Sequence, residues 1–98
     1  MLISSVIKNE AERNKKMIKQ YEELIATLSK GSLICRRGEY YYLKYREKGK
    51  VCDKYVGKEP SVVDRVKKEI EQRKHCEKML YALNQEQKTI AKLLEELQ

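Results

Sequence analysis

All four glycines and the single proline of this 98-residue chain lie between residues 31 and 60. Glycine and proline are the residues that most often interrupt regular elements. Their absence from residues 1–30 and 61–98 allows a long helix on each side, and their spacing in the middle marks turns between short strands. We therefore expect an α+β fold in a single domain spanning residues 1–98. Its elements are a helix at about 4–29, a three-stranded antiparallel meander at about 32–57 and a longer helix at about 61–97.

In the first helix, apolar side chains recur at alternating steps of four and three residues, which predicts one apolar face. These residues are Ile3, Ile7, Met17, Tyr21, Leu24 and Leu28. Glu10 and Asn14 interrupt this face. Gly31 suits a helix C-terminal cap after Ser29 or Lys30.

In the last helix, Ser61 followed by Asp64 resembles a capping box and predicts the helix N-terminus. Four-and-three steps from Val62 give an apolar seam with coiled-coil-like heptads. An uninterrupted helix here would be about 55 Å long, whereas a compact chain of this length is about 30 Å across. The helix therefore either breaks near Asn84 or projects and finds a partner, and the heptad spacing favours a partner. Whether that partner is the first helix or another chain stays open, and a seam that extends to the C-terminus favours a homodimer. The seam residues expected to dimerise are Leu80, Leu83, Ile90, Leu94 and Leu97.

The middle segment is rich in tyrosine, which favours strands. Turns are expected at Arg36-Arg37-Gly38 and Lys48-Gly49. With a two-residue turn at Lys48-Gly49, the expected cross-strand pairs are Lys44 with Asp53, Tyr42 with Tyr55, Tyr45 with Cys52, and Tyr41 with Val56. Such a small sheet needs a helix over one face to be stable.

Positive charge is concentrated in this segment. The chain carries a formal net charge of +7, and residues 30–58 hold nine Lys or Arg against three acids. Cations that reach phosphates, with planar rings beside them, are typical of nucleic-acid binding. The residues expected to bind are Arg36, Arg37, Tyr40, Tyr42, Lys44, Arg46, Lys48, Lys50 and Lys54. The sequence favours DNA over RNA only slightly, and it leaves base specificity open.

Other classes of function lack a matching pattern. No glycine-rich phosphate loop, nucleophile motif or convergent acid/base set is present, so we expect neither an enzyme, nor a cofactor, nor a small-molecule substrate. His75 and Cys76 point about 100° apart on a helix and make a poor pair of metal ligands, so no metal site is expected. Residues 1–7 are apolar but lack the cationic residues that lead a signal peptide, so we do not expect one there. No apolar run is long enough to span a bilayer, so we expect no transmembrane helix. Three widely spaced cysteines fit a reducing, cytoplasmic location.

Two other interpretations of the same residues remain open. Lysines on a small sheet also prevent edge-to-edge aggregation, and tyrosines can simply pack against helices, so the meander can be a purely structural sheet. Alternatively, the chain is an adaptor that recognises an acidic partner or pairs its leucine seam with another protein's helix.

One resemblance covers about a fifth of the chain. The segment from Glu39 to Glu59, with its triple tyrosine and its Lys54-Tyr55-Val56-Gly57-Lys58 run, resembles a segment that lies between helices in small uncharacterised bacterial and mobile-element proteins. That resemblance implies no activity and no site residues. At the level of architecture alone, the meander is similar to the three-stranded arm-type DNA-binding domains of tyrosine recombinases, although none of their motifs is matched.

Overall fold

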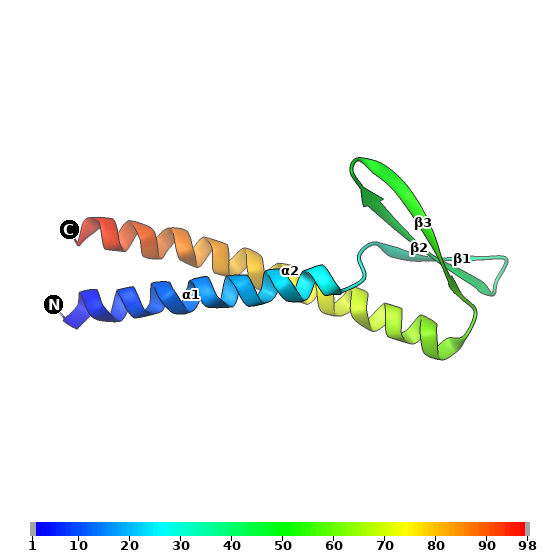
Figure 1. Ribbon diagram of the computed structural model, residues 1–98, viewed down its shortest axis with the longest axis horizontal. Helices are drawn as coiled ribbons and strands as arrows, with labels where there is room; N and C mark the ends of the chain where they lie inside the picture. Colours follow the sequence, from blue (N-terminus) through cyan, green and yellow to red (C-terminus); the bar gives the residue numbers. More distant parts are fainter. Residues whose placement is uncertain (1, 98) are drawn as a thin grey trace. The chain divides into compact units, whose positions relative to one another are not determined.

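The computed structural model describes residues 2–97 and has the expected α+β order (Figure 1). Helix α1 spans Leu2–Thr27, and helix α2 spans Pro60–Glu96. Between them lie strands β1 (Ser32–Arg36), β2 (Tyr40–Glu47) and β3 (Lys50–Gly57). Helix α2 is continuous and does not break near Asn84.

The chain forms two compact units. The helical unit contains residues 2–27 and 75–97, and the sheet unit contains residues 28–74. That the two units together form one domain, as the sequence analysis expects, stays a prediction.

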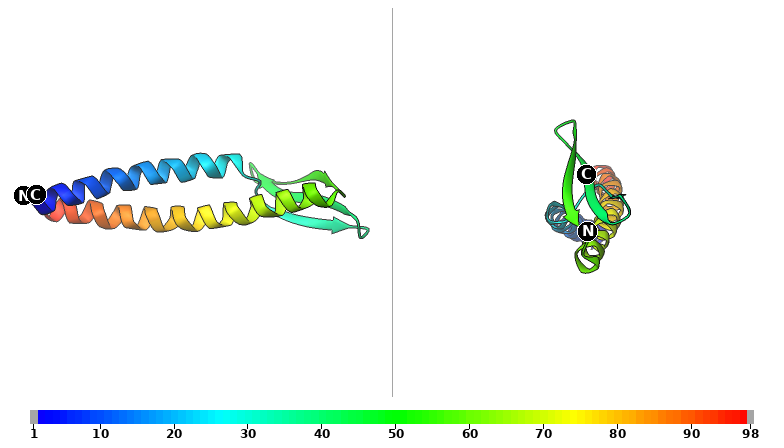
Figure 2. Two further views of the ribbon diagram at one scale, coloured as in Figure 1. Left: turned by 90° about the horizontal axis from the view of Figure 1, so that it is seen from below. Right: turned by 90° about the vertical axis from the view of Figure 1, so that its right-hand side faces the viewer.

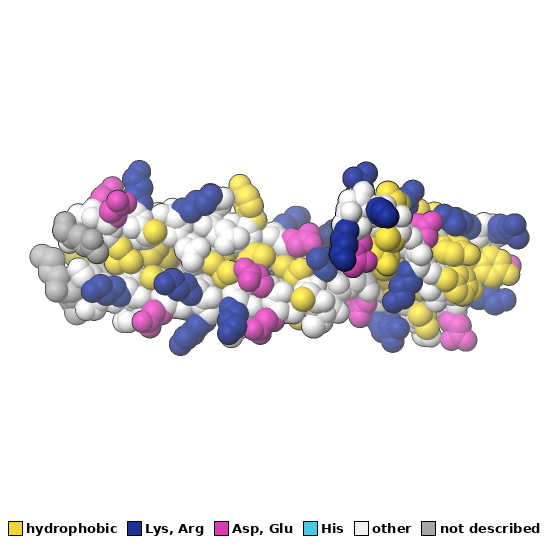
Figure 3. Space-filling model, turned by 45° about the horizontal axis from the view of Figure 1, so that its top comes forward, with side chains coloured by type: hydrophobic (Ala, Val, Ile, Leu, Met, Phe, Trp, Pro, Cys, Tyr) yellow, Lys and Arg dark blue, Asp and Glu magenta, His cyan; other side chains and the backbone are white. Residues whose placement is uncertain are grey.

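In the helical unit, α1 and the C-terminal part of α2 lie side by side and run in opposite directions (Figure 2). Hydrophobic side chains gather along the line where the two helices meet (Figure 3). Ile18 on α1 and Cys76, Leu83 and Ile90 on α2 are all buried. Leu83 and Ile90, which were expected to dimerise, are thus buried within one chain, whereas Leu97 is 46% exposed.

The buried stripe of α1 differs from the expected one. It keeps part of the prediction, because Ile7, Met17, Tyr21 and Leu28 are half-buried. Ile3 and Leu24 are exposed, whereas Ala11, Ile18 and Ile25 are buried or half-buried. Asn14, which interrupts the apolar stripe in the sequence, is only 1% exposed. Its Nδ2 donates a hydrogen bond to the Leu83 carbonyl oxygen at 2.9 Å. The supposed interruption is therefore a polar contact between the two helices.

In the sheet unit, the three strands form an antiparallel sheet in the order β1-β2-β3. Leu43, Val66 and Ile70 form its buried core. Leu33, Tyr45 and Val56 pack against that core. One face of the sheet is thus covered by the first turns of α2, as a small sheet requires.

The expected strand register is confirmed over most of the β2–β3 hairpin. Tyr42 pairs with Tyr55, Lys44 with Asp53 and Tyr45 with Cys52. The expected pair of Tyr41 with Val56 is wrong, because an irregularity between Tyr41 and Tyr42 shifts the register and places Tyr41 opposite Gly57. A bulge of this kind adds a residue to one strand and cannot be located from alternation alone.

Polar contacts hold the segment after α1 against α2 within the sheet unit. Ser29 Oγ donates to Glu69 Oε2 at 2.7 Å, and Arg73 Nη1 donates to the Leu28 carbonyl oxygen at 2.9 Å. The four-and-three steps from Val62 reach three polar residues, namely Glu69, Arg73 and Gln87. The first two lie where α2 contacts this connecting segment.

Two expected caps are wrong. Helix α2 begins one residue earlier than Ser61, because the Glu59 carbonyl oxygen accepts a hydrogen bond from Val63 N at 3.1 Å and Pro60 takes the first helical position. Helix α1 ends at Thr27, before the expected Ser29 or Lys30. Gly31 is not its cap. It has φ 106° and passes so close to the Lys44 carbonyl that a Cβ there would clash with it.

Candidate nucleic-acid interface

Alternation along β2 divides its side chains between two faces. Leu43 and Tyr45 point to the face that α2 covers. Tyr42, Lys44 and Arg46 therefore point to the opposite face, which we call the open face. Lys44 and Arg46 are exposed, and Tyr42 is half-buried.

The tight turns between β1 and β2 and between β2 and β3 each place a positively charged residue at one end of the sheet. Arg37 and Gly38 have φ values of 57° and 76°, and Lys48 and Gly49 have 51° and 78°. Positive φ at both central residues is the geometry of a type I′ turn, whose twist matches that of the strands it joins. The sequence signals for turns at both sites are thus confirmed, with an arginine or a lysine in a left-handed position that usually takes Asn, Asp or Gly.

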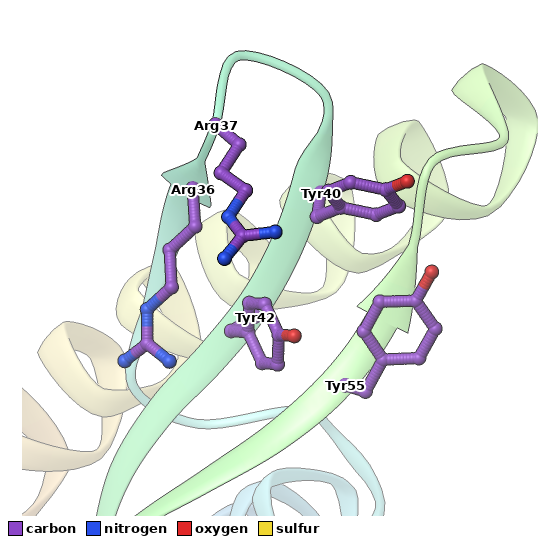
Figure 4. A pocket seen from close by; sticks show the side chains of 5 residues that line it. All are labelled: Arg36, Arg37, Tyr40, Tyr42 and Tyr55. Carbon is purple, nitrogen blue, oxygen red and sulfur yellow. The ribbon is translucent and has the colours of Figure 1, made fainter.

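A recess of about 570 Å³ lies on the open face near the β1–β2 turn. Its lining consists of Arg36, Arg37, Tyr40, Tyr42 and Tyr55 (Figure 4). These side chains come from all three strands and from the turn, and they lie on the same side of the ribbon. The recess therefore combines two guanidinium groups with three aromatic rings.

Arg36 is held in place by its neighbours. Its guanidinium carbon lies 4.6 Å from the centroid of the Tyr42 ring, which is a cation–π distance. Its Nη2 also forms an ion pair with Asp53 Oδ2 at 3.1 Å. Because both side chains of this pair are substantially exposed, the ion pair orients Arg36 more than it stabilises the fold.

The tyrosines of the recess differ in access. The Tyr42 and Tyr55 ring centroids are 5.3 Å apart with the planes tilted by 59°. Tyr42 has Arg36 over one side and is half-buried, whereas Tyr55 is 55% exposed. Lys58 Nζ lies 6.0 Å from the Tyr40 centroid. Tyr55 is therefore the ring of the recess that offers most free surface to a planar ligand.

Arg37 is placed differently from Arg36. Within residues 2–97, the Arg37 side chain forms no ion pair, hydrogen bond or ring contact, and it is exposed. A guanidinium group with all its donors available can take a phosphate with two parallel hydrogen bonds.

The structure brings some of the predicted binding residues together and separates others. Arg36, Arg37, Tyr40 and Tyr42 meet in the recess. Lys44 and Arg46 extend the same face along β2, and Lys48 lies at the far turn.

Lys50 and Lys54 belong to the other face. Lys50 is paired with Glu47, and Lys54 with the buried Leu43, so both point away from the open face. Tyr55 was missing from the predicted site. The predicted pair of Tyr42 with Tyr55 is correct, and paired residues of neighbouring strands lie on the same face, so this pair could have placed Tyr55 in the site.

The remaining two tyrosines of β2 serve the covered face. Lys67 Nζ lies 5.8 Å from the Tyr41 ring, and Lys30 Nζ lies 5.9 Å from the Tyr45 ring. These two rings pack within the sheet unit, as the structural interpretation of the tyrosines expected. The tyrosines are thus divided between packing and the open face.

Within residues 2–97, no group of three His, Cys, Asp or Glu side chains is placed to hold a metal ion. Cys35 is exposed, Cys52 is half-buried and Cys76 is buried, and all three are free thiols. Over the same residues, neither helix is long and apolar enough to cross a membrane.

The chain belongs to the family described as Domain of unknown function (DUF6788), which matches residues 7–72. The match includes most of α1, the whole sheet and the first turns of α2. No curated protein and no solved structure shows significant similarity to the chain. The recess and the open face thus lie inside the segment shared by the family.

Proposed function

We propose that this protein is a non-enzymatic nucleic-acid-binding module that uses the open face of its sheet. The observation that carries the proposal is the recess, in which Arg36 and Arg37 lie beside Tyr40, Tyr42 and Tyr55. Guanidinium groups bind phosphates, and exposed rings stack on bases. Lys44 and Arg46 continue the positive charge along β2 from that recess.

The arrangement of the rings supports a single strand over a duplex. Unpaired bases can stack on an exposed ring, whereas bases inside a duplex cannot. Tyr55 offers such a surface in the same recess as the unpaired Arg37, so a stacked base and a phosphate of the same strand fit the chemistry of the recess. We also propose that the nucleic acid is DNA rather than RNA, which the sequence favours slightly. We further propose that the protein is of bacterial or mobile-element origin. A cytoplasmic location agrees with the three free cysteines.

A charge-reversal experiment with a matched control tests the proposal. The test variant is Lys44→Glu with Arg46→Glu on the open face, and the control is Lys50→Glu with Lys54→Glu on the other face. Both pairs lie on the same small sheet and change the net charge by the same amount, so general electrostatic attraction weakens equally. Binding of labelled single-stranded DNA and RNA is measured by fluorescence anisotropy.

The open-face variant should lose at least about tenfold in affinity, and the control should lose clearly less. Equal losses in the two variants would reduce the interaction to non-specific charge attraction and would refute binding through the open face. Thermal unfolding of both variants is measured alongside. If the open-face variant unfolds early while its residual folded fraction binds normally, the meander is a structural sheet.

A further inference from the structure

Among the residues of the three strands, the open face carries a single acidic side chain, Asp53. It is paired with Lys44 across the β2–β3 hairpin and therefore lies on the open face, whereas Glu47 lies on the other face with Lys50. A negative charge on a surface that binds phosphates lowers the affinity for every nucleic acid. Asp53 therefore opposes the proposed function unless it makes a favourable contact with the ligand itself.

Asp53 forms an ion pair with Arg36 that reaches across the sheet. Arg36 lies on β1 and Asp53 on β3, and Arg36 Nη2 is 3.1 Å from Asp53 Oδ2. The guanidinium carbon of Arg36 lies 4.6 Å from the ring centroid of Tyr42, which is on the middle strand. The side chains of Arg36 and Asp53 are 50% and 38% exposed. The Arg36–Asp53 pair is therefore held over the middle strand and is still accessible to a ligand.

Both partners keep hydrogen-bonding atoms that the pair does not use. Within residues 2–97, Asp53 Oδ1 accepts no hydrogen bond, and Arg36 donates only through Nη2. A guanidinium group has several N–H donors, and each carboxylate oxygen can accept more than one hydrogen bond. The Arg36–Asp53 pair thus presents an N–H donor next to two carboxylate oxygens, which are acceptors.

This order of a donor and two acceptors is complementary to one edge of one base. The Watson–Crick edge of guanine presents the O6 acceptor, then the N1–H donor and then the N2–H donor. Adenine and cytosine instead present an amino donor beside a ring nitrogen that is an acceptor, and thymine presents one N–H donor between two acceptors. A carboxylate therefore meets two adjacent donors on guanine, and at least one lone pair on each of the other bases.

The Arg36–Asp53 pair also borders the ring that is most accessible for stacking. Tyr55 and Asp53 lie on the same face of β3, about 7 Å apart along the strand. Arg36, Tyr42 and Tyr55 follow one another across the three strands (Figure 4). Unpaired bases are recognised by stacking on an aromatic ring and by hydrogen bonds to their Watson–Crick edge. A base stacked on Tyr55 can turn this edge toward Asp53 and Arg36.

We propose that the Arg36–Asp53 pair selects guanine in a single strand. Arg36 donates to guanine O6, and Asp53 accepts hydrogen bonds from N1–H and N2–H while the base stacks on Tyr55. This inference rests on the proposed function, because it assigns base selectivity to the same open face. It also separates Arg36, which reads a base, from the unpaired Arg37, which binds a phosphate.

The base preference of wild type is the first test. The probes are labelled thymine oligonucleotides of about eight nucleotides, within the usual range of single-strand sites, with guanine, adenine, cytosine or thymine at one central position. Wild type should bind the guanine strand at least about fivefold more tightly than each of the other three. Fluorescence anisotropy measures the four affinities under identical salt conditions.

Two analogues of guanine identify the edge that is read. Hypoxanthine lacks the N2 amino group, so the strand that carries it should bind at least about threefold more weakly than the guanine strand. In 7-deazaguanine the N7 acceptor is replaced by carbon and the Watson–Crick edge is kept, so its strand should bind like the guanine strand. The opposite result would overturn the contact with Asp53, because an arginine alone reads guanine through O6 and N7.

Asp53→Asn and Glu47→Gln are a matched pair of variants. Each removes one negative charge from the β2–β3 hairpin, the first on the open face and the second on the other face. Asp53→Asn exchanges one carboxylate acceptor for an amide donor, so its affinities for the guanine and adenine strands should agree within about twofold. Glu47→Gln should keep the wild-type preference. Thermal unfolding checks that both variants are folded at the temperature of the binding experiment.

The outcomes separate this inference from the proposed function. Equal binding of the four strands by wild type would overturn selection of guanine and would leave binding through the open face intact. A guanine preference that Asp53→Asn retains, or that Glu47→Gln loses to the same extent, would also overturn the role of Asp53. If wild type binds none of the strands at low salt, the proposed function itself fails, and this inference fails with it.

Discussion

Among residues 2–97, Arg37 and Lys48 are the non-glycine residues with left-handed backbone, and both carry a positive charge. A long side chain in this conformation costs of the order of 1 kcal/mol relative to asparagine or glycine, which type I′ turns prefer. The two turns therefore hold cations at positions where a neutral residue would give a more stable fold. A binding role for the positive charges at the two turns would explain why Arg37 and Lys48 occupy these unfavourable backbone positions.

This explanation predicts opposite effects on stability and binding. Arg37→Asn should raise the free energy of unfolding by about 0.5–1 kcal/mol, since asparagine tolerates the left-handed conformation. The same change should lower affinity for single-stranded nucleic acid several-fold and reduce the slope of log affinity against log salt by about 0.7, the value for one phosphate contact. Urea unfolding and salt-dependent anisotropy measure the two effects.

Lys48→Asn is the companion variant at the other turn, with the same expected gain in stability. An Arg37→Asn protein that is more stable and binds as well as wild type would remove Arg37 from the interface.

Tyr55 supports a second prediction at the residue scale. Tyr55→Leu keeps an apolar side chain on the strand but removes the ring, so we expect a loss of about 1 kcal/mol in binding to a single strand, or roughly fivefold. Tyr81→Leu is the control, because Tyr81 is also an exposed tyrosine, at 67%, but lies on α2 in the helical unit. Equal affinities for the two variants would contradict stacking on Tyr55.

The site could be predicted from the sequence in part. Arg36, Arg37, Tyr40 and Tyr42 were expected together and line one recess. Lys50 and Lys54 were assigned to the site by charge alone, but alternation along β3 turns both to the other face. Counting charge along a segment therefore overestimates a binding surface on a strand, because about half of the side chains point the other way.

At the scale of elements, the absence of glycine and proline outside residues 31–60 predicted both helices. The spacing of the glycines within that segment, together with its tyrosine-rich run, predicted the meander. The buried side of α1 was harder to predict, because α1 has apolar residues on two neighbouring faces. The predicted and observed patterns share Ile7 and Tyr21, which are half-buried. They differ in whether Ile3 and Leu24 or Ala11, Ile18 and Ile25 complete the buried side, and both sets repeat at helical spacing. Only the packing of α2 decides between them.

Gly31 was expected to cap the first helix, but its observed role is to let the chain pass close to the Lys44 carbonyl. This role can be tested by substitution. Gly31→Ala would combine a left-handed φ with a clash against the Lys44 carbonyl, whereas Gly38→Ala would meet only the unfavourable φ, since nothing lies within 4 Å of a Cβ there. We expect Gly31→Ala to lower the free energy of unfolding by at least about 2 kcal/mol and Gly38→Ala by about 1 kcal/mol. Urea unfolding measures both, and equal losses would show that the backbone of β2 does not approach Gly31 closely.

At the scale of the whole molecule, a dimer would carry two open faces. Two linked sites bind a long ligand more tightly than one, without any new contact, when both can reach it. A chain that sediments as a dimer should therefore bind a much longer strand at least about tenfold more tightly than an oligonucleotide of about five nucleotides, which is the size of a small site. Sedimentation gives the mass and anisotropy with both ligands gives the affinities. Equal affinities for the short and the long strand would show that the two faces act independently.

Binding of nucleic acid by the open face of the sheet is tested by a salt titration of single-stranded DNA binding with wild type. Contacts from Arg37, Lys44, Arg46 and Lys48 predict saturable binding with a slope of about −3 in log affinity against log salt. The Lys44→Glu, Arg46→Glu variant should give a clearly shallower slope, and the Lys50→Glu, Lys54→Glu variant should retain the wild-type slope. Absence of binding by wild type at low salt, or the same slope in both variants, would contradict nucleic-acid binding through the open face.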